Sequence, residues 1–209
     1  QVSYQGEQFI LKEMKESMNY GRDYILMDRC KHFFGLLDMN MRRIRSNQGQ
    51  LKLNPEGKSY VNNVHIGDKN CIYCMMDYWS NEGDLGKNKH RLKDPFIVEE
   101  CLKIRLFDGL FRSSDNILRN ILINTEGELL SIDEGDMFGK RKCIFNHHDW
   151  CKKHIHRDVF EMMINDILDN GEEKLEEIQK IFIHYEFTNF SDFETRFRNY
   201  RKIVLEEVN

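Results

Sequence analysis

Residues 114–135, SDNILRNILINTEGELLSIDEG, hold two short apolar runs separated by a turn at residues 125–127. Apolar runs of this length, bounded by turn residues, are typical of β-strands. A strand, turn and strand this short return the chain to the edge where it started. The sequence therefore predicts a compact hairpin in which Asn120, at the start of the first strand, lies close to Asp133, at the end of the second.

Polar side chains at the ends of this hairpin suggest metal and phosphate chemistry. Mg²⁺ prefers oxygen ligands and is usually held by one or two carboxylates together with substrate phosphates. A phosphoryl-transfer site adds a carboxylate that orients the attacking hydroxyl. Asp115, on the loop that leads into the hairpin, is expected to face the same cleft as Asn120 and Asp133. The alternative is a capping aspartate, a turn asparagine and a strand-end aspartate, which are all common.

The order of these residues resembles the catalytic and metal-binding loops of the protein-kinase-like fold: D-x-x-x-x-N, an apolar strand, a glycine turn, a second apolar strand and I-D-x-G. Residues 106–124, LFDGLFRSSDNILRNILIN, are more similar to the atypical branches (phosphoinositide 3- and 4-kinases, the actin–fragmin kinase and related secretory-pathway kinases) than to ordinary protein kinases. The resemblance implies that Asp115 is the catalytic aspartate. It also implies that Asn120 and Asp133 bind the metal, with Gly135 behind Asp133 in the Asp-x-Gly pattern.

The resemblance extends weakly into the first part of the chain. Residues 9–14, FILKEM, look like the third strand of a kinase small lobe, which implies that Lys12 contacts the ATP phosphates. The helix expected over residues 22–37 would be its partner helix, with Asp28 as the paired carboxylate and Asp23 as the rival. The alternative stays open, because a lysine on an edge strand and charges on an amphipathic helix usually face water.

Residues 71–79, CIYCMMDYW, form a nearly continuous apolar run and are expected to be a buried strand. In the kinase-like resemblance this strand runs into the hinge, which implies that Met75, Met76 and Asp77 lie beside the adenine. Methionines in such a run are equally expected in the core, and the two cysteines of the run are interpreted as buried thiols.

Three departures from the kinase-like pattern bear on activity. Asn116 follows the catalytic aspartate where atypical kinases usually have Arg-His, and Glu134 takes the place of the apolar residue of Asp-Phe-Gly. No glycine-rich phosphate loop precedes Lys12, and a hairpin of that kind needs about ten to fifteen residues. Either the loop lies upstream of Gln1, or the chain is a reduced or inactive member, a pseudokinase-like binding or regulatory module.

A second group of candidate ligands follows the hairpin. Its cysteines and histidines are Cys143, His147, His148, Cys151, His154 and His156. Zinc takes such ligands tetrahedrally, but their spacing fits no standard zinc pattern. A zinc-stabilised nucleic-acid-binding domain is therefore the weaker alternative. Lysines and arginines are interleaved with these cysteines and histidines. In the kinase-like resemblance this segment is the activation-loop region, and its positive charge would face an acidic or phosphate-bearing substrate.

The order of the expected elements is typical of an α+β protein. Strands and one helix occupy residues 1–79, a polar linker covers 80–94, and residues 95–209 are mostly helical around the hairpin. Asp94 and Pro95 form a helix-start signal, as a capping side chain followed by a first-turn proline. With the resemblance, this order implies a two-lobed kinase-like fold with a small, strand-rich N-lobe, truncated if the phosphate loop is missing, and a mostly helical C-lobe.

Two further helix boundaries follow from local signals near the end of the chain. The helical pattern over residues 156–170 is expected to end at Gly171. Ser191, with Glu194 three residues later, has the capping-box pattern of a helix start.

The composition of the chain limits its function class. With 40% apolar and 32% charged residues, the chain is expected to be soluble and globular. A net charge of −4 makes general nucleic-acid binding an unfavoured function, and no apolar run approaches the roughly 18–20 residues of a membrane span. Six cysteines without a secretory signal favour reduced thiols and a cytoplasmic location. The expected partners are ATP, Mg²⁺ or Mn²⁺, and a protein Ser/Thr acceptor, with a lipid as the other acceptor.

Overall fold

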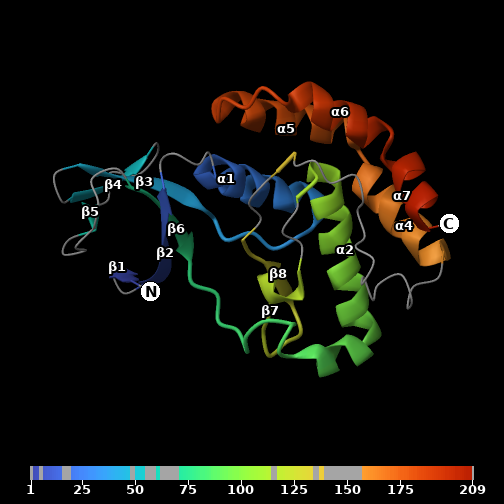
Figure 1. Cartoon of the computed structure of the whole chain (residues 1–209), viewed down its shortest axis with the longest axis horizontal. Helices are drawn as coiled ribbons and strands as arrows, with labels where there is room; N and C mark the ends of the chain where they lie inside the picture. The colour runs from blue at the N-terminus through green and yellow to red at the C-terminus, as the bar shows by residue number, and fades with distance from the viewer. Residues whose placement is uncertain are drawn as a thin grey trace. The chain divides into compact units, whose positions relative to one another are not determined.

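The structure of the chain is a computed structural model (Figure 1). It describes residues 2–4, 7–15, 20–47, 50–54, 60–61, 71–113, 117–133, 137–138 and 157–208. The chain forms two compact units: the first comprises Gln1–Arg29 and Asp38–Ser80, and the second comprises Cys30–Leu37 and Asn81–Asn209. The fold is mixed α+β, as the sequence predicts, with an antiparallel sheet in each unit.

The first unit contains a six-stranded antiparallel sheet with the strand order β1-β2-β6-β3-β4-β5. Its strands are β1 (Val2–Tyr4), β2 (Glu7–Lys15), β3 (Arg42–Asn47), β4 (Gln50–Asn54), β5 (Tyr60–Val61) and β6 (Cys71–Asp77). The longest pairing joins β2 to β6, from Phe9 opposite Asp77 to Lys15 opposite Cys71. β2 and β6 therefore confirm the two strands that the sequence predicts here.

The helix α1 (Tyr20–Lys31) follows β2 and ends earlier than predicted. The sequence predicts a helix as far as residue 37, and this end is wrong. A 3₁₀ turn, η1 (His32–Phe34), follows α1, and Gly35 then adopts a φ of 67°. Glycine reaches this left-handed conformation at little steric cost, so it ends the helical segment, with its N–H bonded to the His32 carbonyl at 3.2 Å.

The central helix of the second unit, α2 (Pro95–Phe111), begins where the sequence predicts. The Asp94 carboxylate accepts a hydrogen bond from the Phe96 N–H at 3.0 Å, and Pro95 occupies the first turn. The helix ends at Arg112, which has a left-handed φ of 53° and donates its N–H to the Gly109 carbonyl at 3.3 Å. The start of α2 that the sequence predicts, with Asp94 as the cap and Pro95 in the first turn, is therefore confirmed.

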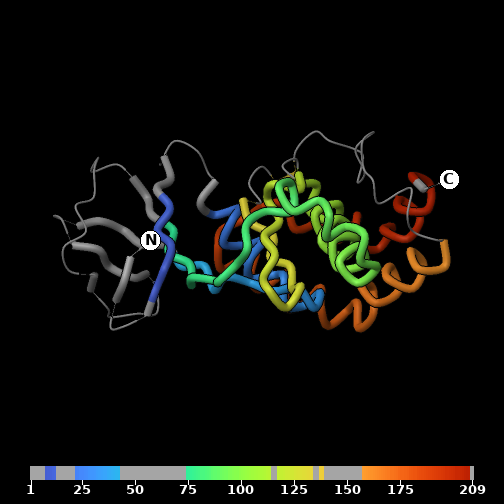
Figure 2. Tube along the Cα trace, turned by 90° about the horizontal axis from the view of Figure 1, so that it is seen from below, coloured from blue at the N-terminus to red at the C-terminus, as the bar shows by residue number. Residues whose placement is uncertain are grey.

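Most of the segment predicted as a linker runs along the hairpin that follows α2 (Figure 2). The N–H groups of Glu82 and Leu85 donate to the carbonyls of Ile123 and Ile121, both at 2.8 Å. The short 3₁₀ helix η2 (Lys89–Lys93) then leads into α2. Residues 81–94 thus belong to the second unit and support the hairpin.

The part of the chain from residue 157 onward is helical. Its helices are α4 (Arg157–Leu168), α5 (Gly171–His184), α6 (Phe190–Arg198) and α7 (Tyr200–Val208). Two predicted boundaries are wrong. Gly171 opens α5 instead of ending α4, because Asn170 (φ 51°) makes the left-handed turn between them. Ser191 lies inside α6, which begins one residue earlier, so it caps nothing there.

Phenylalanine rings join these helices to α2 in one core. The ring centroids of Phe107 and Phe111 lie 4.9 Å apart, and Phe111 lies 4.7 Å from Phe193 of α6. Phe182 of α5 lies 5.5 Å from Phe193. Aromatic pairs at these distances stabilise a core beyond their buried area. The core therefore fixes α2, which leads toward the hairpin.

Candidate functional site

The hairpin predicted from residues 114–135 is present in the second unit. β7 (Ile121–Ile123) pairs antiparallel with β8 (Leu129–Ser131). Its turn uses glycine as expected: Gly127 has a φ of 88° and donates its N–H to the Asn124 carbonyl at 3.2 Å. The Asn124 side chain closes the turn by accepting from the Glu128 N–H at 2.8 Å. This part of the prediction is confirmed.

The open end of the hairpin brings the two predicted metal ligands near each other. Asn120 ends a 3₁₀ turn, η3 (Leu118–Asn120), directly before β7. The Ile132 N–H donates to the Asn120 carbonyl at 2.7 Å. Asp133 directly follows Ile132 in the chain, so its backbone lies next to the residue that donates this bond. An amide side chain and a carboxylate side chain therefore originate from the same end of the hairpin.

Asp133 has an unusual backbone conformation. Its φ is 57°, in the left-handed region, and the residue is half-buried. Aspartate adopts this region more readily than most residues do, yet the conformation still costs free energy. Such residues persist where their surroundings hold them, and they occur frequently at functional sites. The conformation marks Asp133 as a residue that the hairpin holds in a specific orientation.

The end of β8 has a further anchor, which sequence reasoning missed. Lys31, the last residue of α1, is fully buried, and its ammonium donates to the Ser131 carbonyl at 2.7 Å. Lysine is almost never fully buried, so a lysine on a helix is normally expected to face water. No local signal in the sequence identifies a hydrogen bond between residues 100 positions apart.

In the first unit, Lys12 lies on β2, opposite Cys74 of β6. The strand that carries the predicted phosphate-binding lysine is therefore the neighbour of the strand that carries the predicted hinge. The Lys12 ammonium lies 4.4 Å from the centroid of the Tyr24 ring, a distance at which a cation is attracted by the ring face. Its contact with phosphates stays a prediction.

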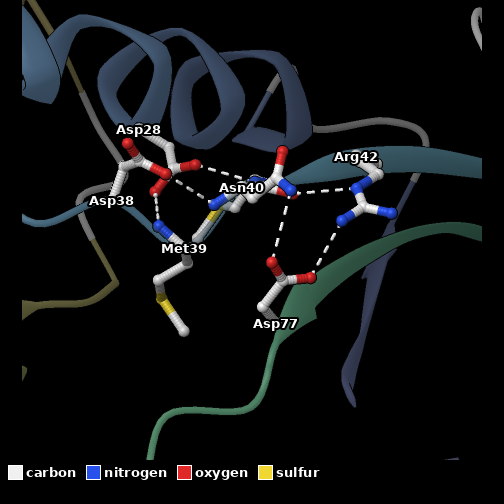
Figure 3. A network of polar contacts seen from close by, with 7 residues as sticks. Asp28, Asp38, Met39, Asn40, Arg42 and Asp77 are labelled. Carbon is white, nitrogen blue, oxygen red and sulfur yellow. Dashed lines mark hydrogen bonds and ion pairs between the residues drawn. The ribbon is translucent and has the colours of Figure 1, made fainter. Parts of the chain in front are cut away.

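Asp28 lies in α1 and is fully buried (Figure 3). Its two carboxylate oxygens accept hydrogen bonds from the N–H groups of Met39 and Met41, both at 2.7 Å. Hydrogen bonds to a carboxylate are stronger than neutral ones, and they compensate for the burial of the charge. Asp28 thus holds the segment between α1 and β3 in place. Its predicted pairing with Lys12 stays a prediction, and its rival Asp23 is half-buried in the first turn of α1.

Asp77, predicted beside the adenine, ends β6 and contacts two residues near the start of β3 (Figure 3). Its carboxylate accepts from Arg42 Nη2 at 2.9 Å and from Asn40 Nδ2 at 3.2 Å. Its N–H donates to the Met39 carbonyl at 2.9 Å. The ion pair is partly exposed and contributes little stability, but the three bonds fix the orientation of Asp77.

The other residues of the predicted hinge are buried. Met75 is 3% exposed and Met76 is 6% exposed, which agrees with a place in the core. Cys30, Cys74 and Cys101 are buried, as expected. Contact of Met75 with an adenine stays a prediction.

Several predicted residues lie outside the described part of the chain. They are Asp115, Asn116, Glu134, Gly135 and the cysteines and histidines of residues 143–156. The proposed catalytic aspartate and the zinc alternative therefore stay predictions. Within the described ranges, no group of three or more His, Cys, Asp or Glu side chains is placed to hold a metal ion. A magnesium site needs fewer protein ligands than that, because substrate phosphates complete it.

Comparisons with protein-family models, with curated proteins and with solved structures found no match. Among the described residues, no helix is both long enough and apolar enough to cross a membrane. The functional argument therefore depends on the hairpin and on the residues that hold it.

Proposed function

We propose that this chain is an ATP-dependent phosphotransferase of the atypical kinase type that uses Mg²⁺ or Mn²⁺ and acts on protein Ser/Thr. In this proposal the fold is the two-lobed kinase-like fold. The first unit supplies the strand-rich small lobe, and the second unit supplies the helical lobe with the catalytic hairpin.

One observation carries the proposal: the hydrogen bond from the Ile132 N–H to the Asn120 carbonyl, directly before the left-handed Asp133. Because of this backbone bond, an amide side chain and a carboxylate side chain start from the same end of the hairpin, and such oxygen donors suit Mg²⁺. Asn120 and Asp133 would hold the ion, which when bound neutralises charge on the ATP phosphates. Asp115 would orient the acceptor hydroxyl and accept its proton.

The first unit supports the same proposal through strand pairing. β2 and β6 pair without interruption from Phe9 to Lys15, so Lys12 lies on a strand held firmly against the predicted hinge strand. A lysine ammonium is a compact charge that suits a phosphate, and Lys12 would contact the ATP phosphates in this role.

A second candidate, a pseudokinase-like binding module, is favoured by the hydrogen bonds at the end of β6. The Asp77 N–H donates to the Met39 carbonyl at 2.9 Å, and the Tyr78 N–H donates to the Gln8 carbonyl at 3.1 Å. The Asp77 carboxylate is also engaged, with Arg42 and Asn40. Groups already bonded within the protein are less available to an adenine.

Thermal unfolding with and without ATP and Mg²⁺ tests the proposal. A ligand at one hundred times its Kd stabilises the folded state by about 2.7 kcal/mol, which is about 5–10 °C in Tm for a chain of this size. We expect this shift in the wild type and its loss in Asp133→Asn. Asp166→Asn, an exposed aspartate on α4, is the matched control and keeps the shift.

The outcomes separate the two candidates. If neither ATP nor Mg²⁺ raises the Tm of the wild type, the phosphotransferase proposal is wrong. That outcome supports the pseudokinase-like module, whose hinge groups are already bonded within the protein. A shift with ATP that persists in Asp133→Asn would mean that ATP binds without the proposed metal ligand, and the role of Asp133 would then be wrong.

A further inference from the structure

We infer that Lys31 is a positioning residue for the metal ligand Asp133, an inference that rests on the proposed function. Lys31 touches neither substrate nor metal in this role. It acts through the backbone of β8, whose last residue immediately precedes Ile132 and Asp133.

A single peptide group carries the argument. The Ser131 carbonyl and the Ile132 N–H belong to the same planar amide. The carbonyl accepts from Lys31 Nζ at 2.7 Å, and the N–H donates to the Asn120 carbonyl at 2.7 Å. This amide is therefore fixed on both sides, by α1 on one and by the residue before β7 on the other. One further amide, between Ile132 and Asp133, separates it from the Asp133 Cα.

Fixing this amide restrains the two predicted metal ligands relative to each other. Two hydrogen bonds on one amide polarise it, so each bond strengthens the other. The left-handed backbone of Asp133 is not favoured by the residue alone, so its surroundings must hold it. With the Lys31 bond removed, the amide loses a hydrogen bond that restrains it, and the backbone that leads into Asp133 is held less firmly relative to Asn120.

The burial of Lys31 supports a specific role over ordinary helix capping. A lysine at a helix end usually donates to the last carbonyls of its own helix and keeps its ammonium in water. Lys31 instead is fully buried and donates to a strand 100 positions away. Burying an ammonium is costly, so a lysine that served only to fill this space would be better replaced by an apolar residue.

Lys174 offers a matched control in the same unit. Its ammonium donates to the carbonyls of Asp166 and Ile167 at the end of α4, both at 3.1 Å. Lys174 lies on α5 and, like Lys31, donates to backbone carbonyls. These two bonds involve no residue of α1 or of the hairpin.

The test measures Mn²⁺ binding by electron paramagnetic resonance in the presence of a non-hydrolysable ATP analogue, with the metal-free Tm as a second readout. Loss of a residue that orients a metal ligand typically weakens metal binding about 10–100-fold. We expect this increase in the Mn²⁺ Kd for Lys31→Met, whose side chain has a similar length without the donor. Lys174→Met should keep the wild-type Kd and change only the Tm. A lysine with a purely structural role would likewise change only the Tm.

The results distinguish the two levels of the argument. If the wild type binds no Mn²⁺ with the analogue, the proposed function fails and the role of Lys31 falls with it. If the wild type binds and folded Lys31→Met has an unchanged Kd, the role of Lys31 alone is wrong. Should Lys31→Met not fold, Lys31→Gln replaces it. Its shorter, uncharged donor should raise the Kd about tenfold, the lower end of that range, and an unchanged Kd overturns the inference.

Discussion

The buried carboxylate of Asp28 allows a quantitative prediction about the first unit. Its two oxygens accept the N–H groups of Met39 and Met41 at 2.7 Å each, and both of these residues are buried. Asp28→Asn keeps the size of the side chain but replaces one oxygen with an NH₂ group. The NH₂ group is a donor and faces a backbone N–H, which is also a donor, so that buried N–H loses its acceptor. The other backbone N–H keeps an oxygen acceptor, but this oxygen no longer carries a negative charge.

The magnitude follows from these two losses. A hydrogen bond to a charged group contributes about 1.5–3 kcal/mol, and a buried donor left without a partner costs about 1–3 kcal/mol. The two figures describe overlapping parts of one change, so we expect Asp28→Asn to lower the free energy of unfolding by about 2–4 kcal/mol. Asp38→Asn is the control. Asp38 accepts from the Asn40 N–H at 2.9 Å but is exposed, so the same substitution should cost less than about 1 kcal/mol.

Urea unfolding followed by far-UV circular dichroism measures both changes. Amide hydrogen exchange at Met39 and Met41 localises the effect, because their N–H groups lose protection when the Asp28 acceptors are lost. Equal costs for Asp28→Asn and Asp38→Asn would mean that burial of the carboxylate does not determine the loss of stability.

Two further predictions concern the second unit. Burial raises the pKa of the Tyr200 hydroxyl well above its usual 10.0. The stability that Tyr200 contributes is therefore present below about pH 10 and is lost above it, by about 1.4 kcal/mol per pH unit until the folded-state pKa is reached. Tyr200→Phe should remove this dependence of stability on pH, which urea unfolding at pH values from about 9 to 11 measures. An unchanged slope in Tyr200→Phe would mean that the hydroxyl ionises as readily in the folded protein as in the unfolded chain. Gly127→Ala should lower the free energy of unfolding by about 1–2 kcal/mol, because Gly127 has a φ of 88° and an added Cβ would lie 3.3 Å from Ile97 Cδ1. A neutral effect in the same urea assay would contradict the turn geometry.

The sequence predicted the elements whose signals are local. The Asp94–Pro95 start of α2 and the glycine turn of the hairpin both depend on residues within a few positions of each other. The strand pattern of β2 and β6 likewise needs no knowledge of the rest of the chain.

The misjudged features depend on contacts between distant residues or on a single backbone angle. α1 stops at Lys31 although its apolar pattern continues to residue 37, because Gly35 and the 3₁₀ turn change the direction of the chain. Lys31 and Asp28 look like surface charges on an amphipathic helix. Their partners at Ser131 and at the segment before β3 appear only in the folded chain.

The decisive assay for the proposed phosphotransferase is transfer of the γ-phosphate of labelled ATP to a protein acceptor in the presence of Mg²⁺. The variants are Asp115→Asn, Asp133→Asn and, as the control, Asp166→Asn. The account predicts transfer by the wild type and the control, and a loss of at least about a thousandfold in the other two, because each removes a group that acts in the transition state. Undiminished transfer by Asp133→Asn, or no transfer by the wild type despite ATP binding, would contradict it.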